Sequence, residues 1–301
     1  MASIIKKVAL AGGSGRLGPA ILEQLLAHNY DVTVLTRVES TATFPAAAKV
    51  QRVDYSSKES LVAALKGQDA VVSAIANPAI DKQIILIDAA VEAGVKRFLP
   101  SEFGSDTTNP KAAVLPVFRN KVNSQKALQE RAAASTTGFT YTTVITGPLI
   151  GWVLTQAFLS VKDKRATLYD GGDHVFSTTT LETIGKAVCA VLAHPDETAN
   201  RVVKVHDTAT TLNELLAKAQ KSVGAEGWTI TKPSVDELLG SSWAGVKQGK
   251  FDWPTLFGFV ITAIQGDGYG GKLENIDNKL LGIPELSDEE LQAVVDKVAK
   301  Y

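Results

Sequence analysis

Three evenly spaced glycines follow the first apolar run of the chain, in the stretch AGGSGRLG. Their pattern is Gly12-x-x-Gly15-x-x-Gly18, with a strand-like run before it at 7–12 and a helical pattern after it at 19–29. Glycine allows a tight turn and a close approach of backbone to a pyrophosphate, and a helix N-terminus favours negative charge. The spacing therefore predicts a dinucleotide-binding loop; a glycine-rich turn without a ligand is the alternative.

A cation stands where a site for NAD usually has an acid. The second apolar run ends in VLTR, so Thr36 and Arg37 occupy this position, whereas Asp31 lies at the start of the run. A guanidinium binds the 2′-phosphate that a carboxylate would repel. We therefore predict NADPH/NADP as the cofactor, with Asp54 near the adenine. A solvated surface arginine is the alternative interpretation of Arg37.

The stretch VKRFLPSEFG, residues 95–104, changes from a strand-like run to a proline followed by functional side chains. Ligands of open parallel sheets bind beyond the carboxyl ends of the strands. If Pro100 marks the end of a strand, Ser101, Glu102 and Phe103 lie near the reactive end of the dinucleotide. In the alternative interpretation these three residues cap neighbouring backbone and pack.

The elements that must position these residues alternate between strands and helices. Strands are expected at 7–12, 31–37, 49–54, 69–76, 95–101 and 139–147, and helices at 19–29, 57–67, 79–94 and 117–134. This alternation predicts an α/β fold, a Rossmann-type doubly wound parallel sheet formed by residues 1–150. Residues 151–301 are expected to form a smaller C-terminal α/β substrate lobe, although the run at 201–207 could return to the main sheet.

Composition excludes several other classes of protein. The chain has 301 residues, a net charge of −1 and no long run of one sign, so we expect neither nucleic-acid nor membrane binding. The longest dense apolar stretch, 256–264, is too short to span a bilayer. The only cysteine, Cys189, indicates a reducing, cytoplasmic location and is expected to be a core thiol. The four histidines are scattered, so no metal is expected.

Five stretches carry a resemblance to a known family: AGGSGRLG, VLTR, VKRFLPSEFG, VFRNKVNSQKAL at 117–128 and YTTVITGPLIGW at 141–152. On these residues the chain resembles the NmrA-like and isoflavone-reductase-like group of atypical short-chain dehydrogenases. The resemblance implies a Rossmann domain, a smaller substrate lobe, and NADPH-dependent reduction of phenylpropanoid-type or isoflavonoid compounds. The same family includes regulators that bind dinucleotide without catalysis.

The resemblance also implies a catalytic lysine. The usual Tyr-x-x-x-Lys pair is missing, because Tyr55, Tyr141 and Tyr169 lack a lysine four positions later. In the family's reductases a lysine on the helix after the Pro-Ser-Glu-Phe-Gly loop takes this role; Lys121 matches it, and Lys126 is a weaker candidate. The chain departs from the plant enzymes at TGPLIGW, which replaces an asparagine-cysteine-phenylalanine pattern, so the plant substrates do not transfer directly.

The expected sites follow from these assignments. The cofactor set is Gly12, Gly13, Ser14, Gly15, Arg16, Leu17, Gly18, Thr36, Arg37, Asp54, Ala74, Ser101, Phe103, Lys121 and Gly147. The substrate cavity is expected to be apolar and aromatic, and to be lined by Ser101, Glu102, Phe103, Leu149, Trp152 and Phe158. Residues 251–270 are expected to supply either a mobile cover or a packed helix.

We therefore expect an NADPH-dependent reductase of an aromatic, phenolic or conjugated carbonyl compound. The first alternative is a dinucleotide-sensing regulator that acts through a protein partner. The second is a related epimerase or dehydratase that uses the same site.

Overall fold

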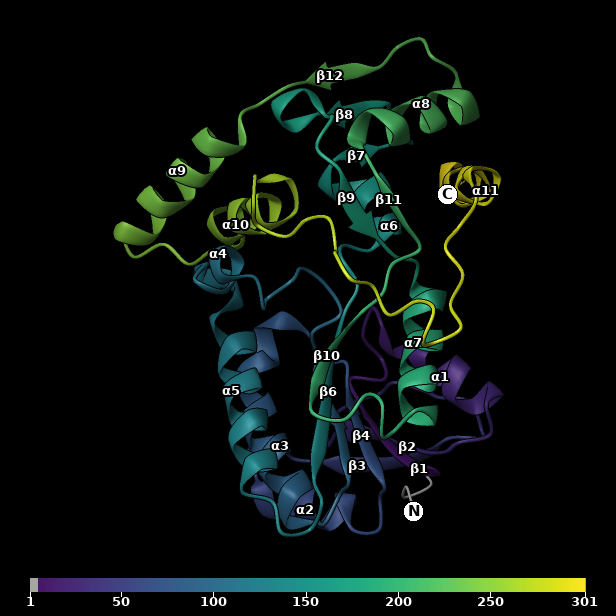
Figure 1. Ribbon diagram of the computed structural model, residues 1–301, viewed down its shortest axis with the longest axis vertical. Helices are drawn as coiled ribbons and strands as arrows, with labels where there is room; N and C mark the ends of the chain where they lie inside the picture. Colours follow the sequence, from purple (N-terminus) through teal and green to yellow (C-terminus); the bar gives the residue numbers. More distant parts are fainter. Residues whose placement is uncertain (1–4, 301) are drawn as a thin grey trace.

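The structure, a computed structural model, describes residues 5–300 apart from the side chains of Asn77 and Pro78. Its largest unit is a parallel seven-stranded sheet with the strand order β10-β6-β5-β4-β1-β2-β3 (Figure 1). The strands are β1 (Lys7–Ala11), β2 (Asp31–Arg37), β3 (Lys49–Val53), β4 (Ala70–Ser73), β5 (Arg97–Leu99), β6 (Thr140–Ile145) and β10 (Arg201–Lys204).

Helices cover both faces of this sheet, as the near-continuous apolar strands predict. On one face α1 (Gly18–Ala27) packs against α7 (Leu181–Ala193), and on the other α3 (Gln83–Glu92) packs against both α2 (Lys58–Leu65) and α5 (Arg119–Ala133) (Figure 1). The strand order reverses beside β1, between β1 and β4, and in such sheets ligands bind at this point. The predicted Rossmann-type fold class is confirmed.

A second set of elements lies beyond the carboxyl ends of the main strands (Figure 1). It contains the small sheet β12-β8-β7 and the antiparallel pair β11-β9. These strands are β7 (Leu159–Ser160), β8 (Arg165–Thr167), β9 (Phe176–Thr178), β11 (Thr208–Thr210) and β12 (Thr229–Thr231). Its helices are α6 (Ile150–Trp152), α8 (Leu212–Val223), α9 (Val235–Lys247), α10 (Trp253–Gln265) and α11 (Asp288–Ala299).

The two sets of elements have separate main apolar cores, and a smaller cluster joins Phe118 to Phe259 of α10. The chain after residue 150 contributes elements to both sets. Phe176, Leu215, Ile261 and Val295 belong to the core of the second set. However, β10 pairs in parallel with β6, with Val202 opposite Thr143, so the run at 201–207 does return to the main sheet. Among the helices of the described residues, none is both long and apolar enough to cross a membrane.

Short 3₁₀ and π segments connect these elements: η1 (Asn77–Lys82), η2 (Pro116–Phe118), η3 (Val153–Ala157) and η4 (Tyr169–Gly171), with the short helix α4 (Pro110–Ala113) before η2. The expected strand 95–101 is shorter in the structure, because β5 ends at Leu99. Pro100 follows and has no N–H to continue the ladder. The residues after it are therefore free to form a loop at the ligand-binding edge.

Candidate active site

The glycine loop after β1 is built for close approach of backbone. Gly12 has a φ of +81°, and a Cβ added there would lie 2.4 Å from the main-chain oxygen of Ala74. The amide of Gly15 donates to the oxygen of Gly12 at 3.0 Å, which closes the turn. A Cβ at Gly18 would lie 2.4 Å from the same oxygen, so α1 packs tightly on its loop. Within the described residues no side chain caps the N-terminus of α1, which suits an anionic ligand.

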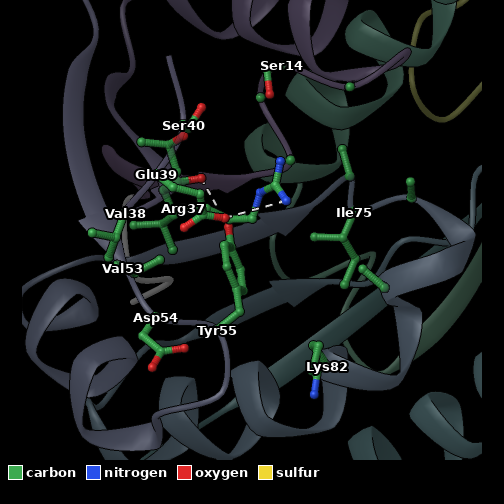
Figure 2. Close-up of a pocket in the computed structure, with 18 of the residues that line it drawn as sticks. Ser14, Arg37, Val38, Glu39, Ser40, Val53, Asp54, Tyr55, Ile75 and Lys82 are labelled. Carbon is green, nitrogen blue, oxygen red and sulfur yellow. Dashed lines mark hydrogen bonds and ion pairs between the residues drawn. The ribbon is translucent and has the colours of Figure 1, made fainter. Parts of the chain in front are cut away.

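A first cavity of about 840 Å³ follows this loop along the carboxyl ends of β1, β2, β3 and β4 (Figure 2). Eight residues of the expected cofactor set line it: Gly12, Gly13, Ser14, Gly15, Thr36, Arg37, Asp54 and Ala74. Thr36 is buried, whereas Arg37 is exposed and pairs with Glu39 through Nη1 and Oε1, 3.6 Å apart. Figure 2 shows this pair beside the Tyr55 ring, with Ile75 and Lys82 on the other side of the view.

Acidic and phenolic groups form the wall after β3. The Asp54 carboxylate accepts hydrogen bonds from the amide and hydroxyl of Ser56, at 2.8 and 2.5 Å, and these bonds lower the pKa of Asp54. The Tyr55 hydroxyl donates to the oxygen of Leu35 at 3.0 Å, and burial raises the Tyr55 pKa. Five further residues line the cavity although no sequence pattern assigned them to it: Glu39, Ser40, Phe44, Tyr55 and Lys82. Tyr55 could have been found from its position directly after the third strand.

A second cavity of about 900 Å³ adjoins the first, and both are lined by Gly15, Ala74, Ile75 and Ala76. It lies between the glycine loop, the loop after β5, the start of α5, α6 and α10. Besides Gly15 and Ala74, the expected site residues that line it are Arg16, Leu17, Ser101, Glu102, Phe103, Lys121, Leu149 and Trp152. The structure therefore brings together most of the residues that the sequence assigned to the reactive end.

Hydrogen bonds from the loop after β5 fix its shape. The Ser101 hydroxyl donates to the oxygen of Ile75 at 2.8 Å, and the Ser101 amide donates to Oε1 of Gln83 at the same distance. Phe103 has a φ of +32°, and its amide donates to the oxygen of Val144 at 3.0 Å. The hydroxyl and amide of Ser101 thus hold the loop to the segments after β4, and the amide of Phe103 holds it to β6.

Lys121 reaches the second cavity from the first turn of α5. Its side chain is buried, at 9% exposure, and Nζ donates to the main-chain oxygen of Glu102 at 2.5 Å. Burial lowers the pKa of Lys121, and the nearby Glu102 carboxylate opposes this change. The weaker sequence candidate, Lys126, is exposed and does not line the cavity.

Aromatic and aliphatic side chains of α10 and the residues before it also line the second cavity. Leu256, Val260 and Ile264 of α10 line the cavity, while Phe259 and Ile261 on other sides of this helix are buried in the protein. The stretch 251–270 thus contains a packed helix that also forms a cavity wall. Phe251, just before this helix, and Trp253, its first residue, line the cavity while remaining 55% and 54% exposed.

Three expected site residues lie outside both cavity linings. Gly18 packs under the glycine loop. Gly147 has a φ of +66°, and a Cβ there would lie 2.4 Å from the oxygen of Ser177. Phe158 is 3% exposed and packs against Tyr169 and Phe176 in the core of the second set of elements. In this structure the three residues pack against neighbouring segments and do not line either cavity.

The strand order, the glycine loop and the two adjoining cavities define a Rossmann-type α/β protein with a dinucleotide-shaped site at its switch point. Residues 5–234 match the model of the NmrA-like family, and the chain belongs to that family. A relative, the oxidoreductase poxI of Penicillium oxalicum, is 34% identical over 300 residues, covering 96% of this chain and 93% of poxI.

Solved structures share the fold. One, described as AtPrR2 with NADP+ and (+)pinoresinol, is 23% identical, with a TM-score of 0.79 and coverage of 99% of this chain and 100% of that one. A crystal structure of isoflavone reductase is 21% identical, with a TM-score of 0.76 and coverage of 97% and 99%. The arrangement of both sets of elements is therefore shared with these two solved structures.

Proposed function

We propose that this protein is an NADPH-dependent reductase of a small aromatic, phenolic or conjugated carbonyl compound. The observation that carries the proposal is the placement of a buried Lys121 beside Phe103, in an apolar cavity that adjoins the dinucleotide-shaped one. The printed names of the relatives, an oxidoreductase and an isoflavone reductase, support this chemistry.

NADPH is the proposed cofactor because of the residues around the first cavity. The open N-terminus of α1 and the glycine loop fit the pyrophosphate, and Arg37 fits the 2′-phosphate. Ser14 and Arg16 lie on either side of Gly15, facing the first and second cavity respectively. The similar structure that holds NADP+ supports the same choice.

In the proposed reaction the cofactor supplies a hydride when it is bound. Negative charge then develops on an oxygen of the conjugated substrate, and the Lys121 ammonium hydrogen-bonds this oxygen or gives it a proton. Phe103 and Trp152 hold the aromatic ring and exclude water from the site. The elements after residue 150 other than α7 and β10, which include Trp152 and α10, are proposed to act as the substrate lobe.

Turnover of a panel of compounds tests the proposal. Phenolic enones, quinones and benzylic ethers are offered with NADPH, and loss of NADPH absorbance is recorded together with the identity of the product. We expect one class to be reduced, with NADPH preferred over NADH. If the protein reduces none of the compounds and binds the oxidised, non-phosphorylated dinucleotide as well as NADPH, the regulator alternative replaces the reductase.

A further inference from the structure

Helix α5 holds the loop after β5 through two side chains, Lys121 and Gln125. These residues are four positions apart, so they lie on the same face of the helix. Lys121 Nζ donates to the main-chain oxygen of Glu102, at 2.5 Å. Gln125 Nε2 donates to Oγ1 of Thr107 at 2.6 Å, and Thr107 Oγ1 donates to Oε2 of Glu102 at 2.8 Å. One helix face therefore contacts both the backbone and the side chain of Glu102.

The Glu102 carboxyl group lies in a site that excludes water and supplies a hydrogen-bond donor to one of its two oxygens. Its side chain is 3% exposed, and Thr107 is 2% exposed. Because the Gln125 amide donates to the Thr107 hydroxyl, this hydroxyl is left to donate its own hydrogen to the Glu102 carboxyl oxygen. The other oxygen, Oε1, is buried and has no hydrogen-bond partner among residues 5–300.

Lys121 is the buried cation nearest to Glu102 in this cavity: its Nζ bonds the main-chain oxygen of Glu102, although no ion pair joins it to the carboxylate among residues 5–300. The other cations that line the cavity, Arg16 and Arg119, are exposed. Asp106 also faces Glu102 and disfavours its charged form, but Asp106 is itself paired with Lys204, whose Nζ lies 2.5 Å from Oδ2. Burial raises the pKa of Glu102, and the strongest opposing influence is Lys121, followed by Thr107 and Gln125. The two groups affect each other's pKa, because burial lowers the pKa of Lys121 and the Glu102 carboxylate opposes this change.

We propose that Glu102 is a positioning residue that keeps Lys121 in its protonated, proton-donating form within the apolar cavity. The inference rests on the proposed function, in which Lys121 acts on the substrate oxygen. A main-chain oxygen alone can orient an ammonium, but an isolated buried ammonium tends to lose its proton. The buried carboxylate counteracts this loss, and the Gln125–Thr107 chain keeps the carboxylate in place.

The proton step is balanced without a further reagent. The Lys121 ammonium breaks one N–H bond, and the substrate oxygen that carries the negative charge forms one O–H bond. The resulting neutral amine takes a proton from solvent before the next turnover. Because the carboxylate stays beside the amine throughout, it favours the return of this proton.

The test measures the charge of Lys121 directly, without any substrate. Protein labelled with [13Cε]lysine and saturated with NADP+ is titrated by NMR, and Lys121→Ala assigns the resonance. The variants are Glu102→Gln, which removes the charge at constant shape, Glu102→Asp, which restores it, and Glu130→Gln. Glu130 lies on the same helix with its side chain 70% exposed, so it is a matched control.

We expect the Lys121 titration midpoint to move to lower pH in Glu102→Gln, to move back in Glu102→Asp, and to stay unchanged in Glu130→Gln. With a substrate from the panel, Glu102→Gln is expected to lose about tenfold or more of kcat/KM at pH 8 and little at pH 6. An unchanged midpoint in Glu102→Gln, or equal shifts in Glu102→Gln and Glu102→Asp, would overturn the inference.

A reciprocal experiment covers the case in which Glu102→Gln does not fold. Coupled groups shift each other, so Lys121→Met must raise the titration midpoint of Glu102, read from [13Cδ]glutamate labelling. No change would again overturn the inference. Absence of turnover by the wild-type protein, by contrast, would count against the proposed reductase and leave the titration result standing.

Discussion

Arg37 and Glu39 face each other at the edge of the first cavity, with Nη1 and Oε1 3.6 Å apart. Both side chains are more than 70% exposed, so this ion pair contributes only about 0–1 kcal/mol. A phosphate bound at Arg37 would therefore displace Glu39 easily, but would still experience its negative charge. The preference for NADPH over NADH is therefore expected to depend on how far the attraction of Arg37 for the 2′-phosphate exceeds the repulsion from Glu39.

Replacing the cation tests its role as the 2′-phosphate contact. A hydrogen bond to a charged group contributes about 1.5–3 kcal/mol, which corresponds to roughly one to two decades of affinity. Arg37→Ser is expected to weaken NADPH binding by this amount and to leave NADH binding nearly unchanged. Calorimetric titration with both nucleotides measures the difference; equal losses would show that Arg37 has a structural role.

Replacing the acid should have the opposite sign. Glu39→Gln removes the competing charge and is expected to tighten NADPH binding by up to about fivefold, the upper limit for an exposed pair. The effect should decrease in high salt, because exposed charges are screened. NADH serves as the control ligand here, and a comparable gain for NADH would count against a specific effect on the 2′-phosphate.

The glycine loop offers a comparison between two positive-φ glycines. A Cβ at Gly12 meets Ala74 at 2.4 Å, whereas at Gly67, with a φ of +76°, no described atom lies within 4 Å. Gly67→Ala should therefore cost only the left-handed strain, about 1–2 kcal/mol. Gly12→Ala adds a collision, so its loss should be larger by at least ~1 kcal/mol, and it should also abolish NADPH binding. Urea unfolding and nucleotide titration of both variants check these outcomes.

Lys121 should control the rate and its dependence on pH. Lys121→Ala is expected to lower kcat by ~10²–10⁴-fold, the usual contribution of acid–base catalysis, with NADPH affinity close to that of the wild type. A general acid works while it is protonated, so activity should be lost as pH rises through the pKa of Lys121. Because burial lowers this pKa, the loss should occur below the ordinary range of lysine. A variant that retains the wild-type rate would remove Lys121 from the mechanism.

Two aromatic residues should separate stability from binding. Phe158→Ala is expected to cost about 3–5 kcal/mol in the free energy of unfolding, because Phe158 lies in a packed core. Trp253→Ala should cost less than ~1 kcal/mol, because Trp253 is half exposed, and should raise KM for an aromatic substrate. Thermal unfolding and steady-state kinetics distinguish the two; a stability loss of similar size in both would contradict this division.

The fold and the dinucleotide end of the site could be predicted because they depend on local rules. Alternation of strand-like and helical runs sets the sheet, and the spacing of Gly12, Gly15 and Gly18 marks the loop. The lysine could be chosen by resemblance, and its burial then distinguishes it from the exposed Lys126. Each of these features is carried by neighbouring residues in the chain.

The remaining features depend on contacts between distant segments. Phe158 was expected at the cavity but does not line it. The residues just before it, Val153–Ala157, form a π-helical segment, which places Phe158 on a different side from the one that the 3.6-residue period of an α-helix predicts. Trp152 and Gln156 line the cavity, and Phe158 turns into the core. The hydrogen bonds that link Gln125 to Thr107 and Thr107 to Glu102 could not be predicted either, because no sequence pattern connects these three residues.

The return of β10 to the main sheet limits how such proteins can be recombined. The chain leaves the main sheet after β6 and returns to it for α7 and β10. It then forms α8 to α10 in the second set of elements. It meets the main sheet again at Asp277, whose carboxylate accepts a hydrogen bond from the backbone amide of Lys204. A chimaera that takes everything after residue 150 from a relative would thus replace the edge strand together with the cavity wall. Transplanting a new substrate preference requires separate grafts of 150–178, 208–265 and 288–299, with α7 and β10 left from the parent.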